Sequence, residues 1–223
     1  MLFRSLPNPE KPLVAVVGTR EPSSYAASRA FVLGRELGEA ELSVVSGLAL
    51  GIDAMAHRGN IEGKAATVAV LGSSPDQVYP SSNRALARRI LETGGIILSE
   101  YPPETGPFKW NFPARNRIIS GLSRGTVIVE APEKSGALIT ARFAVEQGRD
   151  LWMDKAGLES KKGAGMARFA EDGAAVISSA QDILAEWNIK GFGNKGTSLK
   201  KQEEGKQSVK DGLSSSMAEY LEI

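Results

Sequence analysis

The sequence contains no cysteine, which excludes disulfide bonds, iron–sulfur clusters and catalysis by a thiol. It has one histidine, His57, and a single imidazole without cysteine or clustered carboxylates makes a poor metal site, so we expect no bound metal. No apolar run reaches the roughly 18 residues of a membrane-spanning helix, and the first residues lack the apolar core of a signal peptide. We therefore expect a cytoplasmic protein that makes no contact with a membrane.

Two sequence signatures of nucleotide binding are missing where they would be expected. The chain has no Gly-x-x-x-x-Gly-Lys-[Ser/Thr] loop, and the turn Gly18-Thr19-Arg20 after the first apolar run is not Gly-x-Gly-x-x-Gly. We therefore expect neither a P-loop NTPase nor a dinucleotide-binding protein, and no cofactor. The turn still lies where a phosphate-binding turn belongs, so Arg20 is either a phosphate ligand or an ordinary surface charge.

The length and composition are those of a globular protein. A chain of 223 residues suffices for one sizeable α/β domain with an appendage. Apolar residues make up 42% of the chain and charged residues 24%, which are ordinary values. The formal net charge is only +1, so any basic surface that binds a polyanion must be local.

Short apolar runs alternate with stretches of helical periodicity. Runs that are apolar on both faces and separated by helices favour a doubly wound, mostly parallel, Rossmann-like α/β sheet. The runs cover residues 13–17, 42–46, 67–71, 96–99, 126–130 and 151–153, and the main helical stretches cover 24–40, 53–63, 82–93, 114–122 and 138–148. We predict a single domain at 13–190, an N-terminal extension at 1–12, and a flexible tail at 191–223, where apolar residues are few.

A basic segment lies between residues 107 and 129. It has no carboxylate, and its four cations are Lys109, Arg115, Arg117 and Arg124. Trp110 and Phe112 are interleaved with these charges, and cations combined with aromatic rings hold phosphates and stack on bases. Two arginines in the first turn of a helix beginning near residue 114 would oppose the helix dipole, so we expect them to have carboxylate or phosphate partners. Nucleic acid or a nucleotide is therefore the first hypothesis.

A second anion-binding feature follows the fifth apolar run. The turn Lys134-Ser135-Gly136 leads from a strand into a helix and points free backbone N–H groups at an anion. Gly47, after the second run, allows a ligand to approach the backbone closely. Because the carboxyl ends of parallel strands meet in one crevice, we expect these turns to lie together.

Three further residues have alternative interpretations. Glu130 ends a buried strand, so its carboxylate is either a general base or the structural partner of a nearby cation, Lys134 or Arg117. Asp53 is a candidate helix N-cap. His57 lies four residues later on the same helical face, and a structural hydrogen bond is favoured for it over a metal site.

Several motifs resemble the bacterial DNA-processing protein A (Smf) family over about residues 13–187. The motifs are Gly-Thr-Arg at 18–20, Ser-Gly-Leu-Ala-Leu-Gly-Ile-Asp-x-x-Ala-His at 46–57, Phe-Pro-x-Arg-Asn-Arg-Ile-Ile at 112–119 and Lys-Ser-Gly-x-Leu-Ile-Thr at 134–140. The resemblance implies an extended Rossmann-like domain that binds single-stranded DNA, loads the RecA recombinase onto it during natural transformation, and works as a homodimer without enzyme activity. Leu50 departs from the family pattern, which has arginine there.

The resemblance also implies roles for individual residues. Arg20 would contact phosphate, Lys109 the DNA backbone, and Phe112 a base, while Ser135 and Gly136 would hold phosphate beside Lys134. The remaining residues expected in the same DNA-binding site are Thr19, Gly47, Arg115, Asn116 and Arg117.

Two rival functions use the same crevice. One is a nucleotide-processing enzyme that cleaves the N-glycosidic bond of a nucleoside monophosphate, with Glu130 as the catalytic carboxylate and Thr140 beside it. The other is a sensor for a small signalling nucleotide. The open loop at 101–114, with its lysine and aromatic residues, favours a polymer over a sealed small-molecule site.

Overall fold

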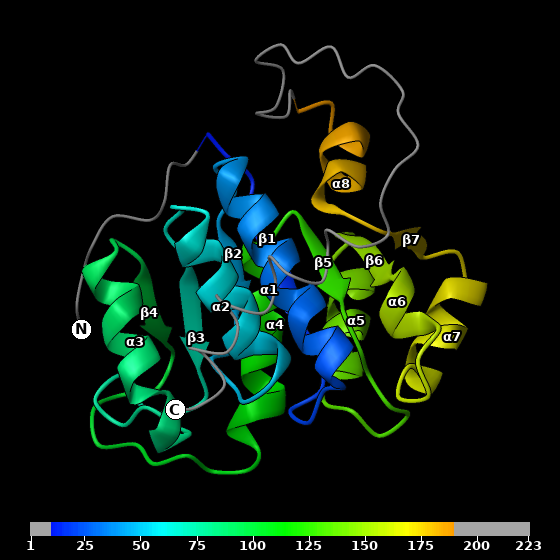
Figure 1. Ribbon diagram of the computed structural model, residues 1–223. Helices are drawn as coiled ribbons and strands as arrows, with labels where there is room; N and C mark the ends of the chain where they lie inside the picture. The colour runs from blue at the N-terminus through cyan, green and yellow to red at the C-terminus, as the bar shows by residue number, and fades with distance from the viewer. Residues whose placement is uncertain (1–9, 190–223) are drawn as a thin grey trace. The chain divides into compact units, whose positions relative to one another are not determined.

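The computed structural model describes residues 10–189, all within one compact unit, Met1–Phe192 (Figure 1). The described residues form a seven-stranded parallel sheet in the order β4-β3-β2-β1-β5-β6-β7. The strands are β1 (Val14–Val17), β2 (Val44–Ser46), β3 (Val68–Leu71), β4 (Ile96–Ser99), β5 (Gly125–Ile128), β6 (Asp150–Asp154) and β7 (Ala175–Ile177). The predicted parallel α/β fold is confirmed. The predicted tail at 191–223 and most of the predicted extension at 1–12 lie outside the described residues.

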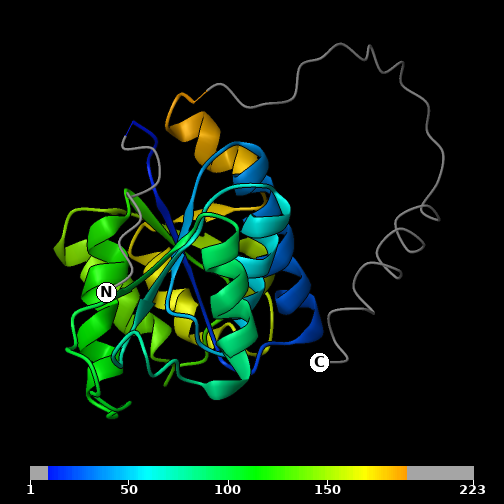
Figure 2. The same ribbon diagram turned by 90° about the vertical axis from the view of Figure 1, so that its left-hand side faces the viewer.

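Helices cover both faces of the sheet, as Figure 2 shows. One face carries α1 (Ser24–Glu39), α2 (Ile52–Glu62), α3 (Arg84–Glu92) and α8 (Ala180–Glu186). The other carries α4 (Asn111–Leu122), α5 (Ala137–Glu146) and α7 (Ala164–Glu171). A 3-10 turn (Ser81–Asn83) precedes α3, and a short helix, α6 (Lys155–Leu158), follows β6.

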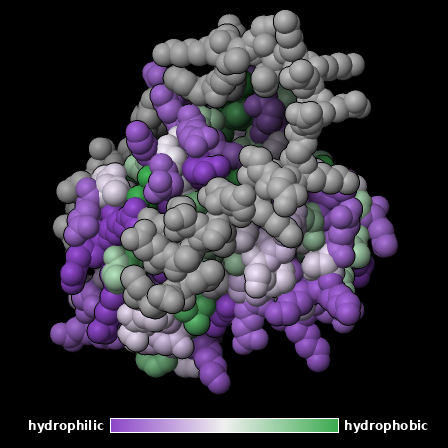
Figure 3. Space-filling model, viewed as in Figure 1, coloured by the Kyte–Doolittle hydropathy of each residue, from purple (hydrophilic) through white to green (hydrophobic). Residues whose placement is uncertain are grey.

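The strand sequences explain this double layer. In β1, Val14 and Val16 pack into one hydrophobic cluster, whereas Ala15 and Val17 pack into the cluster on the opposite face. Successive side chains of a strand point to opposite faces, so a strand covered on both sides must be apolar throughout. None of the helices in residues 10–189 is both long enough and apolar enough to cross a membrane. The described surface visible in Figure 3 is mainly hydrophilic.

The start of α4 differs from the prediction. The helix begins at Asn111 rather than near residue 114, so Pro113 is its third residue. Proline is tolerated in a first helical turn because the N–H that it lacks has no partner within the helix there. Arg115 therefore belongs to the second turn, and the argument from an unfavourable charge in the first turn does not apply.

The chain reverses the direction of sheet growth between β4 and β5. Strands β1 to β4 follow one another outward, and α4 then returns the chain across the opposite face so that β5 pairs with β1. In open parallel sheets, ligands bind beyond the carboxyl ends of the strands at such a reversal. The crevice beyond β1 and β5 is therefore the place to look for a site.

Candidate nucleic-acid interface

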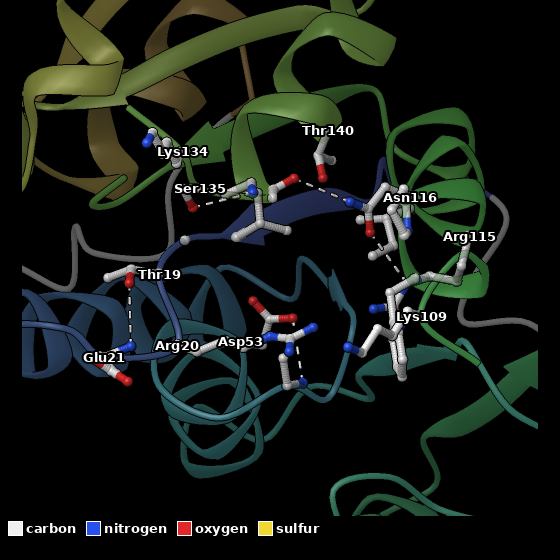
Figure 4. A pocket seen from close by; sticks show the side chains of 18 of the residues that line it. Thr19, Arg20, Glu21, Asp53, Lys109, Arg115, Asn116, Lys134, Ser135 and Thr140 are labelled. Atoms are coloured by element: carbon white, nitrogen blue, oxygen red, sulfur yellow. Dashed lines mark hydrogen bonds between the residues drawn. The ribbon is translucent and has the colours of Figure 1, made fainter. Parts of the chain in front are cut away.

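A pocket of about 700 Å³ opens beyond the carboxyl ends of β1 and β5. Its walls come from the turn after β1, the loop leading into α4, and the turn between β5 and α5; Figure 4 shows their side chains facing one another. Most of the predicted site residues line it: Thr19, Arg20, Lys109, Phe112, Arg115, Asn116, Lys134, Ser135 and Gly136. Gly47 and Arg117 are not part of the lining.

Three exposed cations give the pocket its positive charge. Arg20, Lys109 and Lys134 come from three separate segments, and each is exposed. Among the described residues, no carboxylate lies within ion-pair distance of any of them. The fold thus gathers positive charge that the nearly neutral composition of the chain does not reveal, although the carboxylates of Glu21 and Asp53 also line the pocket.

Phe112 is the aromatic centre of the pocket. Its half-buried ring lies 5.6 Å from the ring of Tyr79, and the guanidinium carbon of Arg20 lies 5.4 Å from its centroid. A Cβ added at Gly72, directly after β3, would lie 2.8 Å from the Phe112 ring. Glycine at position 72 therefore makes room for the ring, which these neighbours hold in place at the pocket wall.

Arg115 belongs to the floor of the pocket. It is only 3% exposed, and its Nη1 donates to the carbonyl oxygen of Gly47 at 2.8 Å and to that of Val70. Asp53 is buried beside it and accepts from the Gly47 N–H at 3.0 Å. Burial lowers the pKa of Arg115 to about 10, opposed by the Asp53 carboxylate, and burial raises the pKa of Asp53, opposed by Arg115. These internal contacts favour an organising role for Arg115 over a direct contact with DNA.

Asn116 and Arg117 have different surroundings from Arg115. The Asn116 side chain donates to the carbonyl oxygen of Gly136 at 3.2 Å, which joins α4 to the turn before α5. Arg117 is exposed and paired with Glu100 outside the lining of the pocket. Gly136 is the N-cap of α5, and a Cβ there would meet nothing within 4 Å, so a ligand has room to approach its backbone.

Glu130 is a structural carboxylate in this fold. It is fully buried and accepts from the Ser23 N–H at 2.8 Å, the Ser23 hydroxyl at 2.9 Å and the Ser160 hydroxyl at 2.8 Å. Ser23 is the N-cap of α1, so Glu130 fixes the start of that helix. The suggestion that Lys134 or Arg117 would pair with Glu130 is wrong. Glu130 does not line the pocket.

Asp53 and His57 also hold the fold together. The N-cap of α2 is Gly51, so the predicted N-cap at Asp53 is wrong. The Asp53 carboxylate instead accepts hydrogen bonds from the backbone N–H groups of Gly47 and Ala49, in the loop before the helix. His57 Nδ1 lies 2.7 Å from the hydroxyl of Thr67, and burial lowers the pKa of His57 to about 3. Sequence reasoning missed the place of Asp53 in the pocket floor because its partner, Arg115, lies far along the chain. The described residues contain no group of three or more potential metal-binding side chains.

Replacing Gly47 with alanine will lower the free energy of unfolding by about 1–3 kcal/mol, because the new methyl group overpacks the floor of the pocket. Its Cβ would lie 2.5 Å from Arg115 Nη2 and 2.7 Å from Asp53 Oδ2. Gly121→Ala, within α4, is the control, since its Cβ would meet only the side chain of Gln147, at an ordinary contact distance of 3.6 Å or more. Urea denaturation of both variants measures the effect, and equal stability of the two would contradict this account of the floor.

Fold and site together define a Rossmann-like α/β protein with a basic, aromatic-lined pocket at the reversal point of its sheet. Residues 5–188 match the family of DNA recombination-mediator protein A, and the chain belongs to this family. The resemblance found in the sequence is thereby confirmed.

Individual relatives agree with this assignment. DNA processing protein DprA of Bacillus subtilis is 43% identical over 173 residues, which are 78% of this chain and 58% of the relative. The X-ray structure of DprA from Streptococcus pneumoniae is 41% identical with a TM-score of 0.74, covering 79% of this chain and 62% of that one. The DprA structure from Helicobacter pylori, described for its single-stranded DNA binding mode, is 31% identical with a TM-score of 0.71. The match covers 80% of this chain and 81% of that one. The chain spans less than two thirds of the first curated relatives that it matches.

Proposed function

We propose that this protein binds single-stranded DNA in the pocket beyond β1 and β5. The observation that carries the proposal is the convergence of three exposed cations, Arg20, Lys109 and Lys134, around the half-buried ring of Phe112. Single strands offer charged phosphates and unpaired bases, and proteins bind them with a basic groove and aromatic rings. The single-stranded DNA binding for which the H. pylori relative is described supports the same ligand.

In this proposal some pocket residues contact the DNA, and others hold the pocket in shape. Arg20, Lys109 and Lys134 neutralise phosphates, and Phe112 stacks on a base. Ser135 and Gly136 offer a phosphate the N-terminal turn of α5, where the helix dipole favours negative charge. The remaining proposed residues, Thr19, Gly47, Arg115, Asn116 and Arg117, line the pocket or fix the elements around it. No covalent bond is made or broken in this scheme. The protein binds single-stranded DNA and passes it to another protein.

Family membership supports a wider role. We propose that the protein protects incoming single-stranded DNA and loads the RecA recombinase onto it in natural transformation or recombination. A pocket of about 700 Å³ holds only a few nucleotides, so a homodimer would gain affinity by engaging one strand at two sites. The RecA role is tested by the rate of RecA filament formation on single strands with and without this protein, and an unchanged rate contradicts it.

The rival enzymatic function receives no support from the geometry. Glu130, its proposed catalytic carboxylate, already accepts three hydrogen bonds and lies outside the pocket lining. Thr140 does line the pocket but is buried. The sensor hypothesis uses the same cations, so a mononucleotide competitor belongs in the binding assay.

Binding of a labelled dT oligonucleotide of about 30 nucleotides will show a log–log salt slope of roughly −2 to −3.5, equivalent to three to five phosphate contacts. Lys134→Ala will weaken binding and make the slope shallower by about 0.7, because one contact is lost. Fluorescence anisotropy at several salt concentrations measures both quantities.

Lys64→Asn is the matched control for charge. Lys64 is exposed and follows the C-terminus of α2, away from the pocket lining, and asparagine tolerates its positive φ of 66°. The control should bind as the wild-type protein does. No binding by folded wild-type protein at low salt would overturn the proposed function, and displacement by a mononucleotide alone would favour the sensor.

A further inference from the structure

A second aromatic cluster lies in the loop that leads into α4. The rings of Phe108 and Trp110 stack with their centroids 5.1 Å apart and their planes 4° from parallel. Phe108 is 49% exposed and Trp110 is 70% exposed. Large aromatic side chains bury 150–250 Å² each when packed, so two rings left in solvent need an explanation.

The stacked rings alternate with residues of the pocket. Pro107, Lys109 and Phe112 line it, whereas Phe108 and Trp110 do not. Trp110 is the N-cap of α4, directly after Lys109 and two residues before Phe112. The stack therefore adjoins the pocket wall along the chain, on either side of Lys109, but is not part of the lining.

The backbone holds this loop in place without a ligand. The Phe108 N–H donates to the carbonyl oxygen of Gly106 at 3.0 Å, and the Asn111 N–H donates to that of Phe108 at 3.0 Å. Because the two rings already stack on each other, ordering them on binding costs little conformational entropy. Trp110 is thus held by a hydrogen-bonded turn and remains largely exposed to solvent.

We propose that the Phe108–Trp110 stack is a second base-stacking platform, which takes a nucleobase on the exposed face of Trp110. Lys109 then neutralises the phosphate between this base and the base on Phe112. The occupant is a polyanion because the segment 107–129 carries only positive charge, with a lysine between the two rings. The inference rests on the proposed single-strand binding and extends the bound segment beyond the pocket.

Tryptophan fluorescence tests the platform directly. The chain has three tryptophans, and the other two, Trp152 and Trp187, are 0% and 7% exposed. Trp110 is therefore the tryptophan that stacking can reach. Saturating dT oligonucleotide of about 10 nucleotides should quench its emission and shield it from acrylamide, while anisotropy of a labelled oligonucleotide reports binding independently.

Variants separate stacking from a structural effect. Trp110→Leu should raise the dissociation constant at least about 5-fold for the oligonucleotide of about 10 nucleotides, and Trp110→Phe should recover much of the loss. An oligonucleotide of about three nucleotides, confined to the pocket, should bind both variants like the wild-type protein. Tyr25→Leu is the matched control because Tyr25 is 66% exposed but does not line the pocket.

The outcomes distinguish this inference from the proposed function. Binding by anisotropy without any change in tryptophan emission, together with wild-type affinity of Trp110→Leu, overturns the platform and leaves pocket binding intact. An equal loss for short and long oligonucleotides also overturns it, since that result indicates a distorted pocket. Absence of binding by the wild-type protein overturns both.

Discussion

Replacing Arg115 with alanine will lower the free energy of unfolding by about 3–5 kcal/mol, because it removes a buried, hydrogen-bonded cation that lies near a buried carboxylate. The change leaves the buried carboxylate of Asp53 without its compensating cation. It also removes the donor to the carbonyl oxygens of Gly47 and Val70. Urea denaturation followed by circular dichroism measures the loss.

Arg117→Ala is the internal control for Arg115, with the same residue type in the same helix. Arg117 and Glu100 form an exposed pair, with side-chain exposures of 48% and 44%. Solvent screens exposed pairs, so this change will alter stability by about 1 kcal/mol or less. If the two variants lost equal stability, the burial of Arg115 would not be the source of its effect.

Replacing Phe112 with alanine will raise the dissociation constant for single-stranded DNA by about 5- to 150-fold, the value of one stacked base. The ring is already positioned by Tyr79, Arg20 and the glycine at position 72. The Phe112 side chain therefore loses little conformational entropy when a base stacks on it. Fluorescence anisotropy with a dT oligonucleotide measures the change.

Phe112→Leu controls for lost volume. Leucine keeps most of the apolar contact with the surrounding side chains but has no flat π face, so this variant should fold normally and still lose much of the affinity. Wild-type affinity for both Phe112 variants would show that no base stacks at this position. The salt slope of either variant should match that of the wild-type protein because no cation is lost.

The strands were predictable because burial on both faces leaves little choice of residue. In β1 and β3, four consecutive residues are buried and apolar, a pattern that solvent-exposed segments do not tolerate. Ends of helices were less predictable. The predicted helix began near residue 114, whereas α4 begins at Asn111 and Pro113 lies inside its first turn. The four-residue helix α6 is too short to show a period.

The pocket lining was largely predictable for the same topological reason. Turns after parallel strands share one edge, so Arg20 and Lys134 could be placed together without knowing any distance. Burial was not predictable. Arginine is rarely buried without a partner, and the partner of Arg115 lies on α2, in a segment to which no local pattern connects it. The serine partners of Glu130 were missed in the same way.

The hydrogen bond from Ser23 to Glu130 spans 107 positions of the chain. It can form only after β5 has been added beside β1, and six of the 21 residues that line the pocket follow β5 in sequence. Contacts between such distant segments come late in folding because loop closure must precede them. On the ribosome, the emerging polypeptide therefore cannot complete the pocket until the fifth strand and the turn that follows it have been synthesised.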